Sequence, residues 1–149
     1  MSALSLAQAE RIVDAALQRA AELGLKPLTV AVLDSGGHLV AFKRQDRSGI
    51  LRPQIAQGKA WGALGMGLGG RSLAQRAAAA PAFFAALGDA SQGRMIPVPG
   101  GVLILDGAEE IVGAVGVSGD HPGQDEACAV HGIEEAGLAA DPGAGPLPP

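Results

Sequence analysis

Several residue types are scarce in this sequence, and each scarcity excludes a class of protein. Tyrosine is absent and aromatic residues make up 3% of the chain, which argues against the aromatic platforms that hold single-stranded nucleic acid. The formal net charge of −4 argues against a basic nucleic-acid-binding surface. A single cysteine cannot form an internal disulfide, which agrees with a reducing compartment. We therefore expect no nucleic-acid partner.

Long apolar segments are missing as well. No apolar run approaches the roughly 18 residues that a membrane helix needs, and the N-terminus lacks a basic segment followed by an apolar core. We therefore expect neither a membrane span nor a secretory signal. We expect a cytoplasmic protein. The chain has 149 residues and 48% hydrophobic content, which fits one globular domain with a proper core.

The hydrophobic pattern predicts helices alternating with pairs of strands. Ser5 to Gln8 has the form of a capping box and opens an amphipathic helix that ends near Gly24. The further predicted elements are strands at 28–33 and 38–43, helices at 52–66, 71–80 and 81–87, strands at 102–105 and 111–117, and a helix at 122–137. Each pair of strands is expected to form a hairpin. Residues 141–149 are rich in proline and glycine and are expected to form a disordered tail.

Positive charge is concentrated in the middle of the chain. Residues 43–94 carry eight Lys or Arg and two Asp or Glu, whereas the remaining residues carry three and thirteen. Arg52 and Lys59 are about two helical turns apart in helix 52–66, so the two cations share a face that suits an anion such as a carboxylate or propionate. A solvated basic face is the alternative.

The same helix contains an unusual set of glycines. Gly58, Gly62 and Gly65 lie inside it, although each costs about 1 kcal/mol relative to alanine in a helix interior. The set indicates close approach by another backbone or by a flat ligand, and we favour packing on the sheet or on another subunit. Trp61 is counted here among the apolar members of the helix.

Polar residues follow the apolar strand 111–117 where the last helix begins. We predict ligand-binding roles for Ser118, Gly119 and Glu126, and acid or base roles for Asp120, His121 and Asp125, because backbone N–H groups are unsatisfied at such a junction. Helix capping alone is the alternative for these acids. The turn formed by Pro99, Gly100 and Gly101 is a candidate anion nest, although a plain tight turn has the same sequence.

We predict that these segments meet in one pocket near a subunit boundary. Two hairpins can pair into one antiparallel sheet, which brings the Pro99 turn and the Ser118–Glu126 junction to one sheet end. Opposite charge then draws Arg52 or Lys59 toward Asp120, Asp125 or Glu126. A structural ion pair satisfies the same argument. A separation of Lys59 from both the turn and Asp125 by more than about 15 Å would contradict the prediction.

Four segments together resemble a known family. They are VAVLDSGGHLVAF at 30–42, Gly58-Lys59-Ala60, IPVPGG at 96–101 and IVGAVGVSGDHPGQDEACA at 111–129. In combination they resemble the GlcG/HbpS-like haem-binding family, which includes the C-terminal domain of PduO-type corrinoid adenosyltransferases. The resemblance covers nearly the whole chain. It implies an α/β domain of the α+β type, a five-stranded antiparallel sheet flanked by helices, with the fifth strand expected near 94–98. It also implies dimers or larger rings.

The resemblance implies haem as a ligand, with His38, His121, His131 and Cys128 as candidate axial ligands. It does not imply a separate metal site, and Cys128 with His131 lacks a third ligand for zinc. Where many relatives have a Ser-Gly-Gly-Thr type of loop, this chain has Ser118-Gly119-Asp120-His121-Pro122. A second departure, the glycine-rich segment from Gly65 to Gly70 followed by Arg71, favours a subgroup with its own small-molecule site.

Three functions follow from these observations. The first is a small-ligand-binding protein that binds or degrades haem. The second is an enzyme acting on a small carboxylated catabolic metabolite by proton-transfer chemistry of the isomerase, lyase or hydrolase type. The third is a non-catalytic oligomeric sensor or assembly module.

Overall fold

A five-stranded antiparallel sheet lies at the centre of the computed structural model, which describes residues 3–147. The strand order is β2-β1-β4-β3-β5. The elements are α1 (Leu6–Leu23), β1 (Thr29–Asp34), β2 (Leu39–Arg44), α2 (Arg52–Met66), α3 (Gly70–Ala79), α4 (Pro81–Ala90), β3 (Gly101–Leu105), β4 (Ile111–Ser118), α5 (Pro122–Glu135) and β5 (Ala139–Asp141). The predicted fold class, an α+β domain with an antiparallel sheet flanked by helices, is confirmed.

Local signals place the first helix correctly. Ser5 is the N-cap of α1, its side chain accepts from the Gln8 N–H, and the Gln8 side chain accepts from the Ser5 N–H. Gly24 ends the helix in the left-handed region at φ +63°, where glycine has no Cβ to clash. The capping box and the C-cap predicted from the sequence are therefore confirmed.

The two predicted hairpins join through their inner strands. β1 pairs with β2, β3 pairs with β4, and β1 pairs with β4, with Val30 opposite Val117. The prediction of a strand at 94–98 is wrong, because the fifth strand is β5, which pairs with β3. The segment 94–98 crosses α2 instead, and Ile96 N donates to the carbonyl of Gly58 at 3.1 Å.

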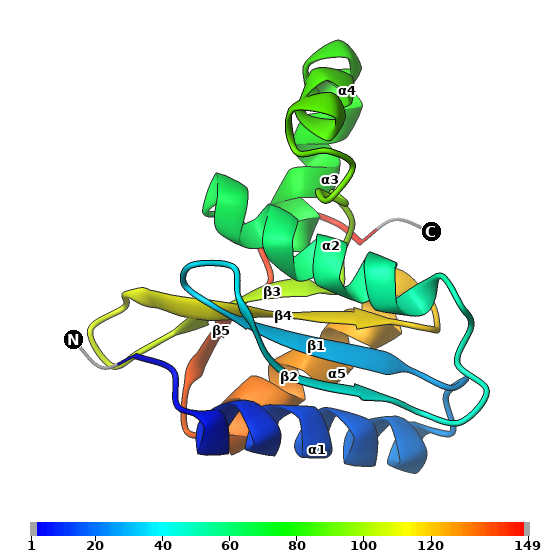
Figure 1. Cartoon of the computed structure of the whole chain (residues 1–149), viewed down its shortest axis with the longest axis vertical. Helices are drawn as coiled ribbons and strands as arrows, with labels where there is room; N and C mark the ends of the chain where they lie inside the picture. Colours follow the sequence, from blue (N-terminus) through cyan, green and yellow to red (C-terminus); the bar gives the residue numbers. More distant parts are fainter. Residues whose placement is uncertain (1–2, 148–149) are drawn as a thin grey trace.

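Helices cover the two faces of the sheet unequally (Figure 1). α1 and α5 lie together on one face, and α2 lies on the other, with α3 and α4 extending away from the sheet beyond α2. The face toward α1 and α5 carries branched side chains such as Val30, Val115 and Val117. The smaller core under α2 contains three alanines beside two leucines: Ala60, Ala63, Ala114, Leu33 and Leu103.

Glycine lets α2 lie very close to β4. A Cβ built on Gly116 would overlap the Ala56 carbonyl of α2, and one on Gly101 would overlap the Lys59 carbonyl. On its other side α2 carries Gly58, where a Cβ would lie 2.7 Å from Ile96 and 2.8 Å from the Arg94 carbonyl. The prediction that another backbone approaches the helix glycines is confirmed at Gly58, but the approaching backbone is the segment 94–96 and not the sheet that we favoured.

The segment that follows α5 pairs with β3 and contacts α3. Asp141 belongs to β5, the Arg71 N–H donates to Pro142 at 3.0 Å, and the Ala144 N–H donates to the Ser72 hydroxyl at 2.9 Å. These bonds to α3 satisfy backbone groups that the composition alone would leave to solvent. Residues 148 and 149 lie outside the described residues, and the disorder expected for 141–149 stays a prediction.

None of the helices within residues 3–147 combines the length and the apolar character that a membrane crossing requires.

Candidate functional site

Lys59 is the centre of the site predicted from the sequence. Its Nζ donates to the Val117 carbonyl at 2.8 Å and to Asp125 Oδ2 at 3.2 Å. The side chains of Lys59 and Asp125 are 4% and 1% exposed. The ion pair therefore joins α2, β4 and α5 inside the protein.

Burial perturbs both members of this pair. Loss of hydration lowers the pKa of Lys59, the Asp125 carboxylate opposes that shift, and the charge of Arg52 adds to it. Loss of hydration raises the pKa of Asp125 against the attraction of Lys59 and the Asp120 N–H, which donates to Oδ1 at 2.9 Å. Each charge is tolerated because the other lies beside it.

The Pro99-Gly100-Gly101 turn lies directly against Lys59. All three residues are buried. Gly100 has φ +108°, and a Cβ there would lie 2.8 Å from Lys59 Nζ. The Gly100 carbonyl accepts from Val117 N at 2.9 Å. The turn thus packs on the ion pair and closes it from solvent.

Arg52 and Ser118 extend this polar network toward the start of α2. Arg52 Nη1 donates to the Ser118 hydroxyl at 3.0 Å, and Ser118 is fully buried. Gly119 follows with no room for a side chain, since a Cβ there would lie 2.8 Å from Leu28. These residues hold the end of β4 against α2.

Asp120 and His121 lie nearer to the surface. The Asp120 carboxylate accepts from Lys26 N at 2.9 Å and from His121 N at 2.7 Å, and these donors hold the pKa of Asp120 below its usual value. His121 is the N-cap residue of α5, yet its ring is exposed and makes no capping hydrogen bond. His121 is thus the one predicted acid–base residue with an open side chain.

Glu126 is paired away from Lys59. Its carboxylate accepts a two-pronged contact from Arg71, with Nε at 2.8 Å from Oε1 and Nη2 at 2.6 Å from Oε2. This contact raises the pKa of Arg71, and Arg71 Nη1 also donates to the Gly145 carbonyl at 3.2 Å. Glu126 therefore ties α5 to α3 and the end of the chain.

The structure thus brings together Lys59, the Pro99 turn, Ser118 and Asp125, well within the predicted limit of about 15 Å. Their donors and acceptors are directed at one another. A ligand-binding or catalytic role for these residues stays a prediction, and the contacts resemble the structural ion pair that was the alternative.

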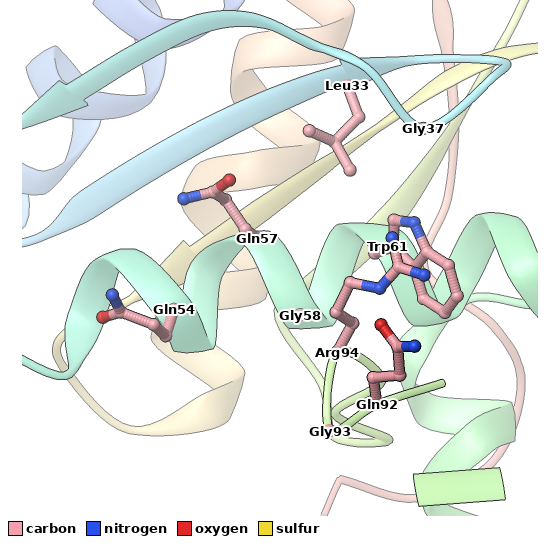
Figure 2. Close-up of a pocket in the computed structure, with 9 residues that line it drawn as sticks. All are labelled: Leu33, Gly37, Gln54, Gln57, Gly58, Trp61, Gln92, Gly93 and Arg94. Carbon is pink, nitrogen blue, oxygen red and sulfur yellow. The ribbon is translucent and has the colours of Figure 1, made fainter. Parts of the chain in front are cut away.

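An open pocket lies on another side of α2 (Figure 2). It has a volume of about 530 Å³. α2 contributes one wall, and the turn after β1 and the segment after α4 contribute the others. The lining residues are Leu33, Gly37, Gln54, Gln57, Gly58, Trp61, Gln92, Gly93 and Arg94. We call this cavity the Trp61 pocket.

An arginine stacked on an aromatic ring marks the Trp61 pocket. The Arg94 guanidinium carbon lies 4.4 Å from the Trp61 ring centroid, and Arg94 Nε donates to the Ser91 carbonyl at 3.1 Å. In the sequence, Trp61 counts only as an apolar helix residue and Arg94 only as one charge of the basic region. The pairing across α3 and α4 leaves no local pattern, so sequence reasoning misses it.

The candidate haem ligands differ in their surroundings. Cys128 is fully buried, and burial raises the pKa of its thiol to about 11, so it does not offer the thiolate that binds haem iron. His131 Nε2 lies 3.7 Å from Glu135. His38 is 80% exposed, and its Nδ1 lies 3.0 Å from Asp34 Oδ1.

The contact between His38 and Asp34 suits a metal ligand. A carboxylate that binds one ring nitrogen fixes the tautomer and leaves the other nitrogen free to ligate. Burial opposes ionisation of Asp34, but the N–H groups of His38 and Gly36 donate to it and hold its pKa below the usual value. His38 also follows Gly37, which lines the Trp61 pocket. Within residues 3–147, no cluster of three or more His, Cys, Asp or Glu is placed to hold a metal ion by itself.

Comparison with known families identifies the domain. A family model described as haem-degrading protein HbpS-like matches residues 4–134. The chain belongs to the HbpS-like family. The match spans both hairpins and all five helices except the last residue of α5, and it confirms the resemblance seen in the sequence. Comparison with curated protein sequences gives no match.

Several solved structures share this fold. PduOC in complex with haem is 25% identical, covers 93% of this chain and 98% of its own, and superposes with a TM-score of 0.83. Klebsiella pneumoniae ORFY is 27% identical, with 92% of each chain covered and a TM-score of 0.79. A crystal structure of HbpS is 27% identical, with 90% of each chain covered and a TM-score of 0.77.

Proposed function

We propose that this HbpS-like protein binds haem and that His38 supplies a ligand to the iron. The family description and the haem complex of PduOC support haem as the ligand class. The contact between His38 and Asp34 is the observation that carries the choice of residue. A bound haem supplies iron-centred chemistry that amino-acid side chains lack.

The protein's own contribution begins with the proton on His38. With Nδ1–H donating to Asp34, the lone pair of Nε2 points outward and is available to a metal. Among residues 3–147, no hydrogen bond involves Nε2 of His38. In the described part of the chain, no carboxylate bonds the His121 ring, and His131 has its Nε2, the outer nitrogen, beside Glu135.

A hemin titration tests this proposal. The wild-type protein should shift the Soret band of added hemin, and His38→Ala should abolish or alter that shift because the iron loses its ligand. His121→Ala and His131→Ala are matched controls that should keep the wild-type spectrum. A His38→Ala spectrum identical to wild type would exclude His38, and a wild-type spectrum equal to that of free hemin would exclude haem binding.

Asp34→Asn gives a finer test of the same contact. The amide cannot stabilise the imidazole as a carboxylate does, so hemin should still bind but with weaker affinity. An unchanged affinity would show that Asp34 only shapes the turn.

We further propose that the protein self-associates, as the resemblance implies. Apolar side chains lie exposed on the edge strand β2 and on α4, where Leu39 is 50% exposed and Phe83 is 55% exposed. None of the ten residues of α4 is buried. Sedimentation velocity of wild type and of Phe83→Ser should give a larger species for wild type, and a monomer for both would contradict the proposal.

The enzymatic alternative depends on residues that the fold uses internally. Asp125 is 1% exposed and bonded to Lys59, and both Asp120 oxygens accept backbone hydrogen bonds. Of the three predicted acid–base residues, Asp120, His121 and Asp125, only His121 is exposed. Proton transfer to a small carboxylated metabolite therefore stays a prediction, and it is tested by whether any activity found survives His121→Ala.

A further inference from the structure

We propose that the Trp61 pocket binds a carboxylate carried on a flat, largely apolar body. The inference concerns a site that the sequence did not predict and that the haem proposal does not require. It rests on the lining charge, on the geometry of Arg94 and on the apolar lining side chains.

The lining of the pocket is suited to a single negative charge. Arg94 is its one cation, and none of the lining residues is an acid. Three carboxamides, those of Gln54, Gln57 and Gln92, supply neutral donors and acceptors around it. An anion entering here meets one compensating charge and no repelling carboxylate within the lining.

Arg94 is held in place by one hydrogen bond, and its other donors are available to a ligand. Its Nε donates to Ser91, and its plane stacks on Trp61. Within residues 3–147, neither Nη1 nor Nη2 of Arg94 makes a hydrogen bond. Guanidinium nitrogens with this geometry bind carboxylates through two parallel hydrogen bonds, and Figure 2 shows the side chain lying beside Trp61 with Gln92 next to it.

Apolar side chains line the pocket together with these polar groups. Leu33, which is 2% exposed, and Trp61 are the two large apolar side chains among the lining residues. Gly37 leaves room for Trp61 to lie close to the turn, because a Cβ there would lie 3.2 Å from the indole ring. The volume of about 530 Å³ exceeds what a carboxylate group fills, so the ligand carries a body that contacts Leu33 and Trp61.

Two sources share this chemistry. One is a free metabolite with an aromatic or conjugated body, and the other is a haem propionate, since His38 adjoins the pocket. The test therefore uses a small probe first and haem second.

Naphthoate is the probe, and naphthamide, which carries an uncharged amide in place of the carboxylate, is the control. Trp61 is the only tryptophan of the chain, so a nitrogen–proton correlation spectrum shows one indole signal that reports on this pocket. Naphthoate should move that signal in a saturable way and should give a measurable affinity by calorimetry, whereas naphthamide should bind more weakly. Equal binding of the two compounds would overturn carboxylate recognition.

Variants test the residue assignment. Arg94→Gln should weaken naphthoate binding by about tenfold or more, because the charged fork is lost, and Arg94→Lys should fall between it and wild type. Arg76→Gln removes the same charge from the exposed face of α3 and should leave binding unchanged. Gln57→Glu adds a negative charge to the lining, which should repel the naphthoate carboxylate and also weaken binding. Unchanged affinity in both Arg94→Gln and Gln57→Glu would overturn the proposal.

Competition distinguishes the two sources. Displacement of naphthoate by hemin assigns the pocket to a propionate, and retention of naphthoate in the hemin-bound protein assigns it to a free carboxylate. Both results support carboxylate recognition. Failure of hemin to bind the wild-type protein would overturn only the haem proposal. Equal affinity for naphthoate and naphthamide would overturn only the proposal that the Trp61 pocket binds a carboxylate.

Discussion

The two sides of α2 place polar residues in very different surroundings. On the side toward the sheet, Lys59 is 4% exposed and paired with Asp125, and the Pro99 turn closes over it. On the outer side, Arg94 and three glutamines surround an open cavity beside Trp61. Lys59, the cation that stands out in the sequence, is buried in an ion pair, whereas Nη1 and Nη2 of the less conspicuous Arg94 make no hydrogen bond among residues 3–147.

The difference comes from desolvation. A buried charge needs a partner at all times, so Lys59 and Asp125 satisfy each other. A charge at a pocket rim keeps its water until a ligand replaces it, and this makes Arg94 available. Substitutions at the buried pair should therefore mainly lower the free energy of unfolding, whereas substitutions in the Trp61 pocket should mainly weaken ligand binding.

Breaking the buried pair should have the largest effect. Asp125→Ala should lower the free energy of unfolding by about 3 to 5 kcal/mol, because Lys59 is left charged and unpaired inside the protein. Urea denaturation measures the loss. Asp125→Asn is the matched control, and it should lose less because its oxygen can still accept from the Asp120 N–H. A loss below about 1 kcal/mol in Asp125→Ala would mean that the pair behaves as a surface ion pair.

A double substitution sharpens the same point. Lys59→Met combined with Asp125→Leu removes both charges of this pair and leaves neither one unpaired, so the double variant should be more stable than Asp125→Ala alone. Full recovery is not expected, since the Val117 carbonyl and the Asp120 N–H lose partners. A double variant no more stable than Asp125→Ala would contradict the explanation by an unpaired charge.

Close packing of α2 on β4 should have the next largest effect. Gly116→Ala should lower the free energy of unfolding by about 1 to 3 kcal/mol or more, because its Cβ would overlap the Ala56 carbonyl. Gly107→Ala is the control, since nothing lies within 4 Å of a Cβ there. Thermal and urea unfolding of the two variants give the comparison, and equal stabilities would show that α2 can shift freely.

Two arginines allow a direct comparison of the sides. Arg52→Gln removes a hydrogen bond to the buried Ser118 hydroxyl and should cost about 1 kcal/mol of unfolding free energy. Arg94→Gln should change it by less than about 0.5 kcal/mol, as expected for a surface substitution. The two values are measured by urea denaturation at the same pH. A larger loss for Arg94→Gln would mean that its stacking on Trp61 supports the fold.

Acid should produce the smallest effect, at Asp120. Backbone donors hold its pKa below the 3.8 of an unperturbed Asp, so its carboxylate stabilises the folded state above about pH 4 and loses that contribution as the pH falls through the lowered value. The stability difference between wild type and Asp120→Asn should therefore shrink from about pH 7 to about pH 3. Solvent screening keeps the change to a fraction of a kcal/mol. An equal difference in unfolding free energy between wild type and Asp120→Asn at both pH values would contradict this prediction.

The sequence by itself determined the elements that depend on local chemistry. The capping box at Ser5, the C-cap at Gly24, the two hairpins and the bounds of α2 follow from neighbouring residues and from hydrophobic period. The glycine set in α2 also predicted close packing, because few other reasons place glycine inside a helix. Charge and topology brought Lys59 to Asp125, although they did not decide what the pair does.

Tertiary structure decided the rest. The fifth strand forms at 139–141 because β3 offers an open edge there, whereas 94–98 is held across α2 by its bond to Gly58. The fate of each charge depends on how much water it loses, which only the packed structure sets. Lys59 was therefore buried with its partner, and the approach of the segment after α4 to α2 placed Arg94 on Trp61. Contacts between residues so far apart in the chain leave no periodic signal, because they are selected by the packing of whole elements.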